Sequence, residues 1–191
     1  VKNNLELNIY EDKDFDWILH FGANTIIPET IQQADIIYFE NISSTLNALA
    51  LAKKCNSSIL FLSSYVYGKP DRIPINEDHS VSALNSYINS KLICERLCND
   101  FMNDINKSVI ILRCFNIYGY GLKPGRLVHD IIFSAINENK ISLNDARPKR
   151  DYLYIDDFCE LIKNIIFKDK IIKDIYNVGS GMSYSNLKIA E

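Results

Sequence analysis

The feature that most constrains this chain is an alternation of short apolar runs with longer segments of helical periodicity. Apolar runs at residues 16–21, 58–62 and 109–115 read as buried strands, and a short strand is predicted at 175–178. Helical spacing covers residues 41–54, 86–103 and about 127–137, and Asp156 with Asp157 can cap a helix through Phe167. Continuous apolar strands separated by helices indicate a parallel sheet covered on both faces. The predicted fold class is therefore α/β, with a doubly wound, Rossmann-like parallel sheet.

Size and charge limit the classes of function that the chain can have. Its 191 residues are 47% hydrophobic, which is enough to bury a sizeable core. The net charge is −3 and the basic residues are scattered, so nothing indicates a nucleic-acid partner or an anionic membrane. We find no apolar stretch long enough to span a membrane and no signal peptide.

The cysteines indicate the compartment. They are five, an odd number, and most lie within apolar strand or helix patterns: Cys55, Cys94, Cys98, Cys114 and Cys159. We interpret them as reduced core residues of a cytoplasmic protein. Cys94 and Cys98 share a helix face, but no histidine or second cysteine pair accompanies them, so we expect no metal site.

A candidate proton-transfer site lies in the helix predicted over residues 86–103. Tyr87 and Lys91 stand four residues apart, so the phenol and the ammonium share one helix face. The ammonium favours the phenolate and lowers the pKa of a tyrosine from about 10 toward neutral pH. Such a phenol can take a proton from a substrate alcohol while hydride leaves its carbon. Ser63, at the end of the preceding strand, would hydrogen-bond the same oxygen.

The spacing of tyrosine and lysine is weak evidence by itself. It occurs twice more, at Tyr65 with Lys69 and at Tyr184 with Lys188. The first pair encloses a glycine where a strand turns into a loop, and the second has no strand ending in hydroxyls ahead of it. A bare pair is more typical of a solvated helix face. The upstream Ser63 therefore favours Tyr87 and Lys91.

Polar clusters directly follow three of the apolar runs. They are His20-Phe21-Gly22-Ala23, Ser63-Ser64-Tyr65 and Asn116-Ile117-Tyr118-Gly119. Each alone is also ordinary turn chemistry. Parallel sheets bind ligands beyond the carboxyl ends of their strands, so these clusters are where a ligand site is expected.

Six blocks of the sequence, taken in order, resemble the extended short-chain dehydrogenase/reductase family in its NAD-dependent epimerase/dehydratase branch. The blocks are residues 16–23, 41–47 and 63–68, the pair Tyr87 and Lys91, and residues 113–119 and 150–157. The second block resembles a helix start of the family, with Ser44 where glycine is usual. The order and spacing of the blocks make the resemblance specific from about Asp16 onward.

The resemblance implies an enzyme that binds NAD and a nucleotide-sugar substrate. The catalytic residues would be Ser63, Tyr87 and Lys91. The cofactor would contact His20, Phe21, Gly22, Ala23 and Asn41 as well as Tyr87 and Lys91, and the substrate would contact Ser64, Asn116 and Arg150. The implied mechanism moves hydride to NAD while Tyr87 removes the hydroxyl proton.

The choice of reaction depends on the residues after the catalytic hydroxyl. Nucleotide-sugar 4,6-dehydratases of this family carry an Asp-Glu pair there, and this chain has Ser64 and Tyr65, neither of which is a carboxylic acid. We therefore predict 4-epimerisation, with reduction of a 4-keto sugar as an alternative. A non-catalytic remnant that binds nucleotides weakly is the alternative of another class. The identity of the sugar, the choice between NAD and NADP, and whether the protein forms a homodimer stay open.

The family opens with a strand and a Gly-x-x-Gly-x-x-Gly turn that holds the cofactor pyrophosphate, and this chain lacks that turn. It also stops at Glu191, where a helix begins. Both ends look cut, so we expect the chain by itself to bind NAD poorly and not to turn over. The predicted divisions are an incomplete NAD-binding domain at 1–118, part of a small C-terminal substrate lobe at 119–154, a return to the first domain at 155–179, and the start of a truncated segment at 180–191.

Overall fold

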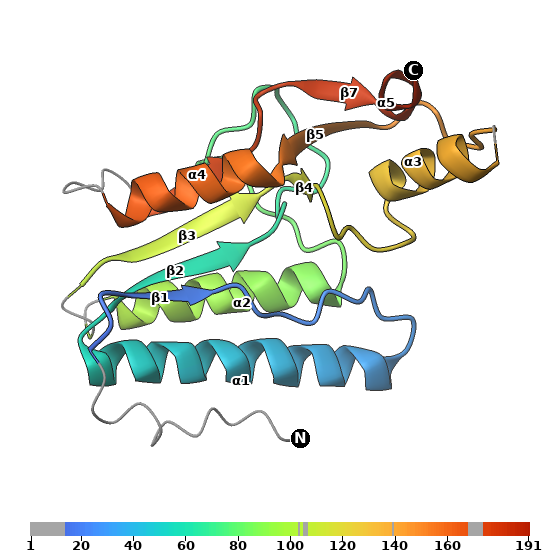
Figure 1. Ribbon diagram of the computed structural model, residues 1–191. Coiled ribbons are helices and arrows are strands. Elements are labelled where there is room, and N and C mark those ends of the chain that lie inside the picture. Colours follow the sequence, from blue (N-terminus) through green and yellow to red (C-terminus); the bar gives the residue numbers. More distant parts are fainter. Residues whose placement is uncertain (1–13, 103, 105–106, 139, 168–173) are drawn as a thin grey trace. The chain divides into compact units, whose positions relative to one another are not determined.

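The computed structural model describes residues 14–102, 104, 107–138, 140–167 and 174–191 (Figure 1). The chain divides into two compact units. The first comprises residues 1–113 and 169–177, and the second comprises residues 114–168 and 178–191. The lobe expected at 119–154 falls within the second unit, together with the helix expected to end at Phe167. Residues 1–13 of the first expected domain lie outside the described part of the chain.

A parallel sheet forms the centre of the first unit, with the strand order β1-β2-β3-β6 (Figure 1). Its strands are β1 (Trp17–His20), β2 (Ser58–Ser63), β3 (Val109–Cys114) and β6 (Ile175–Val178). β2 pairs in parallel with β1 and with β3. The amides of Ile111 and Phe115 donate to the carbonyls of Asp174 and Val178, a constant offset that a parallel pair of strands requires. The predicted α/β class with a parallel sheet is confirmed.

The strands of this sheet differ in burial. β2 and β3 are buried along nearly their whole length, as their continuous apolar runs predict. β1 is only partly buried, and the side chain of Leu19 is 42% exposed. The strand predicted at residues 16–21 is present as β1, but the prediction that it is buried is wrong except at His20. β1 pairs on one side only among the described residues, so its side chains have fewer neighbours.

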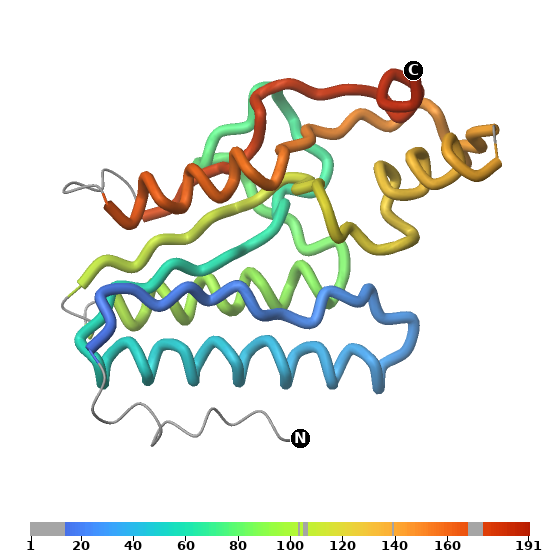
Figure 2. Tube along the Cα trace, in the orientation of Figure 1, coloured from blue at the N-terminus to red at the C-terminus, as the bar shows by residue number. Residues whose placement is uncertain are grey.

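Two helices, α1 (Ile31–Cys55) and α2 (Ser86–Phe101), lie side by side over one face of this sheet, and Figure 2 shows their parallel paths along the strands. Apolar residues of both helices pack on odd-numbered residues of β2 and β3. The shared core comprises Ala48, Leu49, Ala52, Ile59, Phe61, Cys94, Cys98, Val109 and Ile111. Residues two apart in a strand share a face, so Ser63 and Arg113 point to this side of the sheet as well.

Helix α1 begins earlier than the sequence interpretation placed it. Its N-cap is Thr30, whose hydroxyl accepts from the amide of Gln33, while the side chain of Gln33 accepts from the amide of Thr30. This reciprocal pair is a capping box, and it satisfies two amides at the helix start. Asn41, interpreted as part of a helix start, is a buried residue in the middle of α1. The expected helix start at residue 41 is therefore wrong.

The second unit contains a small mixed sheet that the sequence interpretation did not predict. Its strands are β4 (Asn116–Tyr118), β5 (Lys149–Tyr154) and β7 (Ser183–Ser185). β5 pairs in parallel with β4 and antiparallel with β7. The helices are α3 (Leu127–Asn137), α4 (Ile155–Ile166) and α5 (Asn186–Ala190). α3 has the predicted bounds.

Helix α4 starts differently from the prediction. Its N-cap is Tyr154, without a side-chain hydrogen bond, and Asp156 and Asp157 lie inside the first turn. The two carboxylates therefore do not cap the helix. They can still stabilise it, because negative charge in the first turn faces the positive end of the helix dipole.

The cysteines are free thiols, and their burial is uneven. Cys94, Cys98 and Cys114 are buried and Cys55 partly so, whereas Cys159 on α4 is exposed, which contradicts a core position for that residue. Burial raises the pKa of Cys98 to about 12 and also raises that of Cys94, so both thiols stay protonated near neutral pH.

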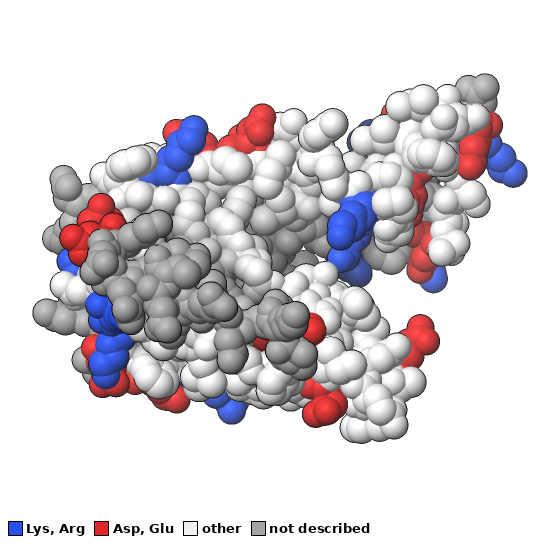
Figure 3. Space-filling view, turned by 60° about the horizontal axis from the view of Figure 1, so that its bottom comes forward, with Lys and Arg blue, Asp and Glu red and all other residues white. Residues whose placement is uncertain are grey.

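The described part of the chain offers neither a metal site nor a membrane-spanning helix. Within the described ranges, no group of three or more His, Cys, Asp or Glu could hold a metal ion. No described helix is long and apolar enough to cross a membrane. Small groups of basic and acidic side chains are interspersed with uncharged surface on the face drawn in Figure 3.

Candidate active site

One face of α2 carries Tyr87, Lys91 and Glu95 at intervals of four residues, and it faces β2. Asn85 caps the helix by accepting a hydrogen bond of 2.9 Å from the amide of Ile88, which places Tyr87 in the first turn. Tyr87 is half-buried. Lys91 is 3% exposed, and its Nζ lies 4.3 Å from the ring centroid of Phe61. The helical setting predicted for Tyr87 and Lys91 is confirmed.

The two competing tyrosine and lysine pairs have no such setting. Tyr65 and Lys69 lie in the loop after β2, on either side of Gly68, whose φ of 65° is left-handed. Tyr184 is in β7, whereas Lys188 is in α5. Only Tyr87 and Lys91 share a helix, as the context of the sequence indicated.

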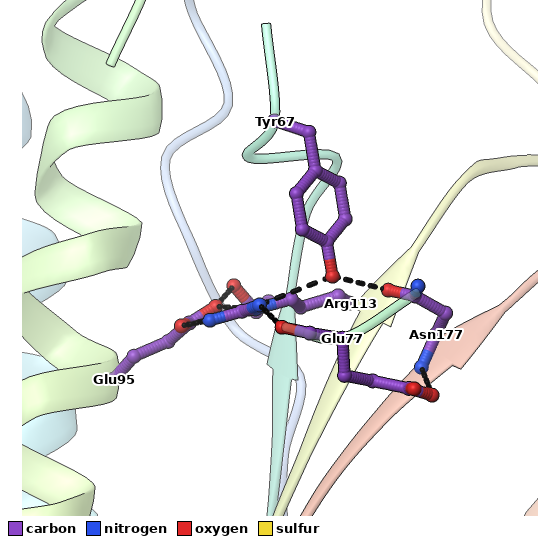
Figure 4. A network of polar contacts seen from close by, with 6 residues as sticks. Tyr67, Glu77, Glu95, Arg113 and Asn177 are labelled. Carbon is purple, nitrogen blue, oxygen red and sulfur yellow. Dashed lines mark hydrogen bonds and ion pairs between the residues drawn. The ribbon is translucent and has the colours of Figure 1, made fainter. Parts of the chain in front are cut away.

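Ser63 lies at the carboxyl end of β2, where it meets a buried ion pair. Ser63 and Arg113 are register partners on β2 and β3 and point to the same face of the sheet. Glu95 reaches both residues from α2. Its Oε1 accepts a 2.5 Å hydrogen bond from Ser63 Oγ. Its carboxylate also accepts three bonds of 2.8–3.2 Å from Nε and Nη2 of Arg113 (Figure 4).

The same guanidinium extends this network to the loop that follows β2. Arg113 Nη1 donates to the hydroxyl of Tyr67 at 3.0 Å and to the carbonyl of Glu77 at 3.1 Å (Figure 4). The hydroxyl of Tyr67 in turn donates to Oδ1 of Asn177 at 2.6 Å, and the backbone amide of Asn177 donates to Oε1 of Glu77 at 3.0 Å. The network thus ties the loop at residues 65–77 to β3 and β6.

The pKa values of this network follow from burial and pairing. Burial by itself would lower the pKa of Arg113, but hydrogen bonds and charge from Glu95 and Tyr67 outweigh it and raise the pKa. Burial raises the pKa of Tyr67. Arg113 therefore stays a cation, and Tyr67 stays a neutral phenol able to donate to Asn177.

His20, at the end of β1, is buried and neutral. Its ring lies 5.5 Å from that of Phe61, and its Nε2 is 3.0 Å from the hydroxyl of Thr45. That hydroxyl donates its only proton to the carbonyl of Asn41 at 2.8 Å, so Nε2 of His20 must be the donor. Burial, and after it the charge of Lys91, lower the pKa of His20 from 6.5 to about 4. The side chain therefore adds no second positive charge beside Lys91 at neutral pH.

Asn41 joins the loop after β1 to both helices. Its Oδ1 accepts from the amide of Asn24 at 2.7 Å, and its Nδ2 donates to the carbonyl of Asn24 at 3.1 Å and to Ser90 Oγ at 2.9 Å. Ser90 then donates to the carbonyl of Tyr87 at 2.7 Å. Both amide protons of Asn41 are thus engaged, so the described contacts give Asn41 a positioning role toward the loop and Tyr87.

The loop that contains Phe21, Gly22 and Ala23 has open space beside it. Phe21 and Gly22 are exposed. A Cβ added at Gly22 would meet nothing within 4 Å, and the backbone of Gly22 is not left-handed. Neither packing nor backbone conformation therefore requires glycine in the described structure. Space beside a held loop, together with the buried cation of Lys91, fits the approach of an anionic dinucleotide.

The residues expected to bind substrate are divided between the units. Ser64, half-buried after β2, belongs to the first unit, whereas Asn116 and Arg150 belong to the second. Nδ2 of Asn116 donates to the carbonyl of Asp151 at 2.9 Å and so joins β4 to β5. Arg150 is exposed, and within the described ranges its guanidinium donates only to the carbonyl of Lys149, at 3.3 Å.

The second unit also contains a cavity of about 490 Å³ that the sequence interpretation missed. Its lining is mainly aromatic and aliphatic and comes from residues 118–122, α3 and Tyr154. Exposed apolar residues of α3, among them Ile132 and Phe133, line one side. The volume suits a small ligand.

Sequence reasoning also missed Glu95 and Thr45, and it gave Arg113 no role of its own. The sequence did contain a signal for the ion pair of Arg113 and Glu95. Arg113 interrupts the apolar run at residues 109–115, and a charge buried in a strand needs a partner. Glu95 stands four residues after Lys91 on the same predicted helix face, where it could have been proposed as that partner.

Comparison with known proteins identifies the family. Residues 2–179 match the model of the NAD dependent epimerase/dehydratase family. The chain belongs to this family. The expected resemblance is confirmed, and the parallel sheet with a second small sheet agrees with epimerase structures.

Individual relatives of this family member are distant. A UDP-glucose 4-epimerase of Lactobacillus helveticus is 26% identical over 96% of the chain and 62% of its own length. A dTDP-D-glucose 4,6-dehydratase of Dictyostelium discoideum is 28% identical over 96% of the chain and 45% of its own length. The crystal structure of UDP-glucose 4-epimerase from Bifidobacterium longum with NAD+ and UDP superposes with a TM-score of 0.79, at 28% identity, over 95% of the chain and 61% of that chain. The family member thus spans about three fifths of the length of the epimerases that it matches.

Proposed function

We propose that the protein catalyses 4-epimerisation of a nucleotide sugar with NAD, by transient oxidation of the sugar carbon. The observation that carries this proposal is the face of α2 on which Tyr87 and Lys91 precede Glu95, with Glu95 bonded to Ser63 at the end of β2. A phenol, a buried ammonium and a strand-end hydroxyl are the groups that alcohol oxidation needs. Membership of the epimerase/dehydratase family supports the same class of chemistry.

The proton chemistry belongs to Tyr87 and Lys91. Lys91 is buried, so water screens its charge little. An ammonium on the same helix face as Tyr87 stabilises the phenolate. The phenolate takes the proton of the sugar hydroxyl during oxidation and returns it during reduction. The neutral imidazole of His20 leaves Lys91 as the main positive charge beside the phenol.

The cofactor fits on the loop after β1. His20, Phe21, Gly22 and Ala23 would lie along it, with Asn41 holding the loop and with Tyr87 and Lys91 beside it. When bound, NAD supplies the hydride acceptor and donor that no side chain can provide. The open space at Gly22 supports a close approach to the backbone.

The residues that follow Ser63 favour epimerisation over 4,6-elimination. Ser64 and Tyr65 stand where the dehydratases have two carboxylic acids. Moreover, the hydroxyl of Tyr65 donates to the carbonyl of Gly68 at 2.8 Å, which engages its proton in the local turn. Neither residue offers the acid and base that elimination of water requires.

The residues proposed for substrate contacts are Ser64, Asn116 and Arg150. Arg150 is exposed and weakly held, so its guanidinium can turn to a diphosphate and bind it with two parallel hydrogen bonds. Nucleoside diphosphate hexoses are the natural first assay substrates, because the relatives include UDP-glucose and UDP-glucuronic acid 4-epimerases and a dTDP-D-glucose dehydratase.

The test is incubation of a full-length protein, in which the family's glycine-rich turn precedes this sequence, with NAD and, one at a time, UDP-glucose, UDP-N-acetylglucosamine, UDP-glucuronic acid and dTDP-glucose. We expect the 4-epimer of one of them by NMR, and none with Tyr87→Phe as the matched control. A 4-keto-6-deoxy product would overturn epimerisation in favour of dehydration. Consumption of NADH or NADPH with a 4-keto sugar, and no epimer, would identify a reductase. Binding without any turnover would indicate a non-catalytic protein.

A further inference from the structure

One face of the small sheet carries two of the residues proposed for substrate contacts, with two tyrosines beside them. Asn116 on β4 is the register partner of Tyr152 on β5, and Arg150 on β5 is the register partner of Tyr184 on β7. Register partners point to the same face of a sheet, and so do residues two apart in one strand. The four side chains therefore share one face of the second unit.

Asp151, on the opposite face of β5, holds the turn that leads into β7. Its carboxylate accepts bonds from the amide of Ser180 at 2.7 Å, from the hydroxyl of Ser180 at 2.8 Å and from the amide of Gly181 at 2.9 Å. Three bonds to one carboxylate hold the backbone of this turn against β5. The backbone of β7 is thereby fixed beside β5, so Tyr184 stays the neighbour of Arg150.

The side chains of Tyr184 and Arg150 are exposed and weakly engaged. Tyr184 is 37% exposed, and within the described ranges its hydroxyl donates only to the sulfur of Met182, at 3.5 Å, a weak acceptor. Burial raises the pKa of Tyr152, and the charge of Arg150 opposes that rise, so the guanidinium acts on this face. Opposite residues of an antiparallel pair have Cβ atoms about 4.5–5.5 Å apart, which lets the ring of Tyr184 lie under the guanidinium.

We propose that Tyr184 is a positioning residue for Arg150: its ring stacks on the guanidinium and holds it against the diphosphate of the nucleotide sugar. This inference rests on the nucleotide-sugar substrate of the proposed function. A guanidinium is planar, so it can stack on an aromatic face while its N–H groups stay free to bind a phosphate. A ring that orders the arginine side chain also reduces the entropy that the side chain loses on binding.

The second unit offers matched variants for this proposal. Tyr184→Leu keeps an apolar side chain on β7 but removes the aromatic face, whereas Tyr184→Phe keeps the ring and removes only the hydroxyl. Arg150→Met removes the group that the ring would hold. Tyr120→Leu is the control, because Tyr120 is a fully exposed tyrosine of the same unit that lies outside the three strands.

The measurement is the calorimetric affinity of the full-length protein for UDP, which requires no turnover. We expect Tyr184→Leu to weaken UDP about fivefold, as for the loss of one exposed cation–π contact. Tyr184→Phe and Tyr120→Leu should leave the affinity within about twofold of the wild type. Arg150→Met should weaken UDP more strongly, and in that background Tyr184→Leu should cause no further loss, because residues that act as a unit are not additive.

An unchanged affinity in Tyr184→Leu would overturn this inference and leave the proposed function standing. Equal weakening by Tyr184→Leu with and without Arg150 would also overturn it, because the ring would then bind the nucleotide directly. So would an equal loss in Tyr184→Phe, which would assign the effect to the hydroxyl. If Tyr184→Leu does not fold, Tyr184→Thr, which suits a strand, replaces it. If the protein shows these differences in UDP affinity but epimerises no sugar, the proposed reaction fails and the pairing of Tyr184 with Arg150 stands.

Discussion

The two units of this protein differ in how far their polar side chains are buried and hydrogen-bonded. In the first unit Ser63, Glu95 and Arg113 are each less than 10% exposed, and every one is hydrogen-bonded to another. In the second unit Arg150 is exposed and makes one long bond to its neighbour, and the cavity wall is mostly apolar. The first arrangement is fixed before any ligand arrives, whereas the second can adapt to one.

This difference indicates a division of labour. Chemistry requires groups held within a fraction of an ångström, and buried networks hold them that closely because unpaired alternatives are unfavourable. Recognition of varied substrates tolerates side chains that reorient on binding. We therefore expect changes in the first unit to alter rate and stability, and changes in the second to alter affinity.

The largest expected effect tests the chemical side of this comparison. In a full-length protein that includes the family's glycine-rich turn, Tyr87→Phe should lower kcat by about 10²–10⁴-fold, since it removes the proposed acid/base group, and should leave NAD affinity nearly intact. Lys91→Met should lower both, because in the proposed function its ammonium stabilises the phenolate and also lies beside the cofactor. Steady-state kinetics and NAD titration measure the two quantities separately. Equal and mild effects of both substitutions would contradict the assignment.

The next effect compares one arginine from each unit. Arg113→Met should lower the free energy of unfolding by about 3–5 kcal/mol, because it leaves the Glu95 carboxylate buried without its partner. Arg150→Met should change it by less than about 0.5 kcal/mol, since Arg150 is exposed, but should raise the Kd for a nucleoside diphosphate. Denaturant unfolding with both variants measures the contrast. Equal destabilisation by the two changes would break the comparison.

His20 should make the free energy of unfolding depend on pH by about 3 kcal/mol, because burial lowers its pKa from 6.5 to about 4. The folded protein holds the imidazole neutral, whereas the unfolded chain protonates it below about pH 6.5. This stability is therefore complete above pH 6.5 and is lost as pH falls toward 4. His20→Gln should flatten that part of the stability curve.

The matched control for His20 is Thr45→Val. It removes the hydroxyl that accepts from Nε2 but keeps the buried imidazole. Burial is the main cause of the lowered pKa, so most of the pH slope should remain in this variant. If Thr45→Val abolishes the slope as fully as His20→Gln, the hydrogen bond and not burial controls the titration.

The smallest effect concerns Asn41, which links the loop after β1 to both helices. Asn41→Ala removes two hydrogen bonds to partly buried backbone groups of Asn24 and should lower stability by about 1–3 kcal/mol. It should also weaken NAD binding, because the loop would lose its fixed position. Asn89→Ala, which removes a partly buried bond to Tyr38, is the control and should do neither to the same extent.

The sequence was sufficient for elements whose signal is local. The apolar runs of β2 and β3, the bounds of α3 and the shared helix of Tyr87 and Lys91 all follow from side-chain periodicity within one segment. The start of α1 was missed although Thr30 and Gln33 formed a readable capping box. The apolar spacing and the family pattern both indicated a helix start at Asn41, and both were misleading there because α1 continues upstream to Ile31.

The tertiary structure decided which side chains meet. That Ser63 stands beside Arg113 depends on the register between β2 and β3, strands separated by about fifty residues and a helix. That Glu95 binds both depends on how α2 lies over the sheet. No local pattern contains this information, because register and helix placement minimise the free energy of the packed core as a whole. The sequence by itself determined the residues of the proton-transfer chemistry, and only the fold brought Ser63, Glu95 and Arg113 into one network.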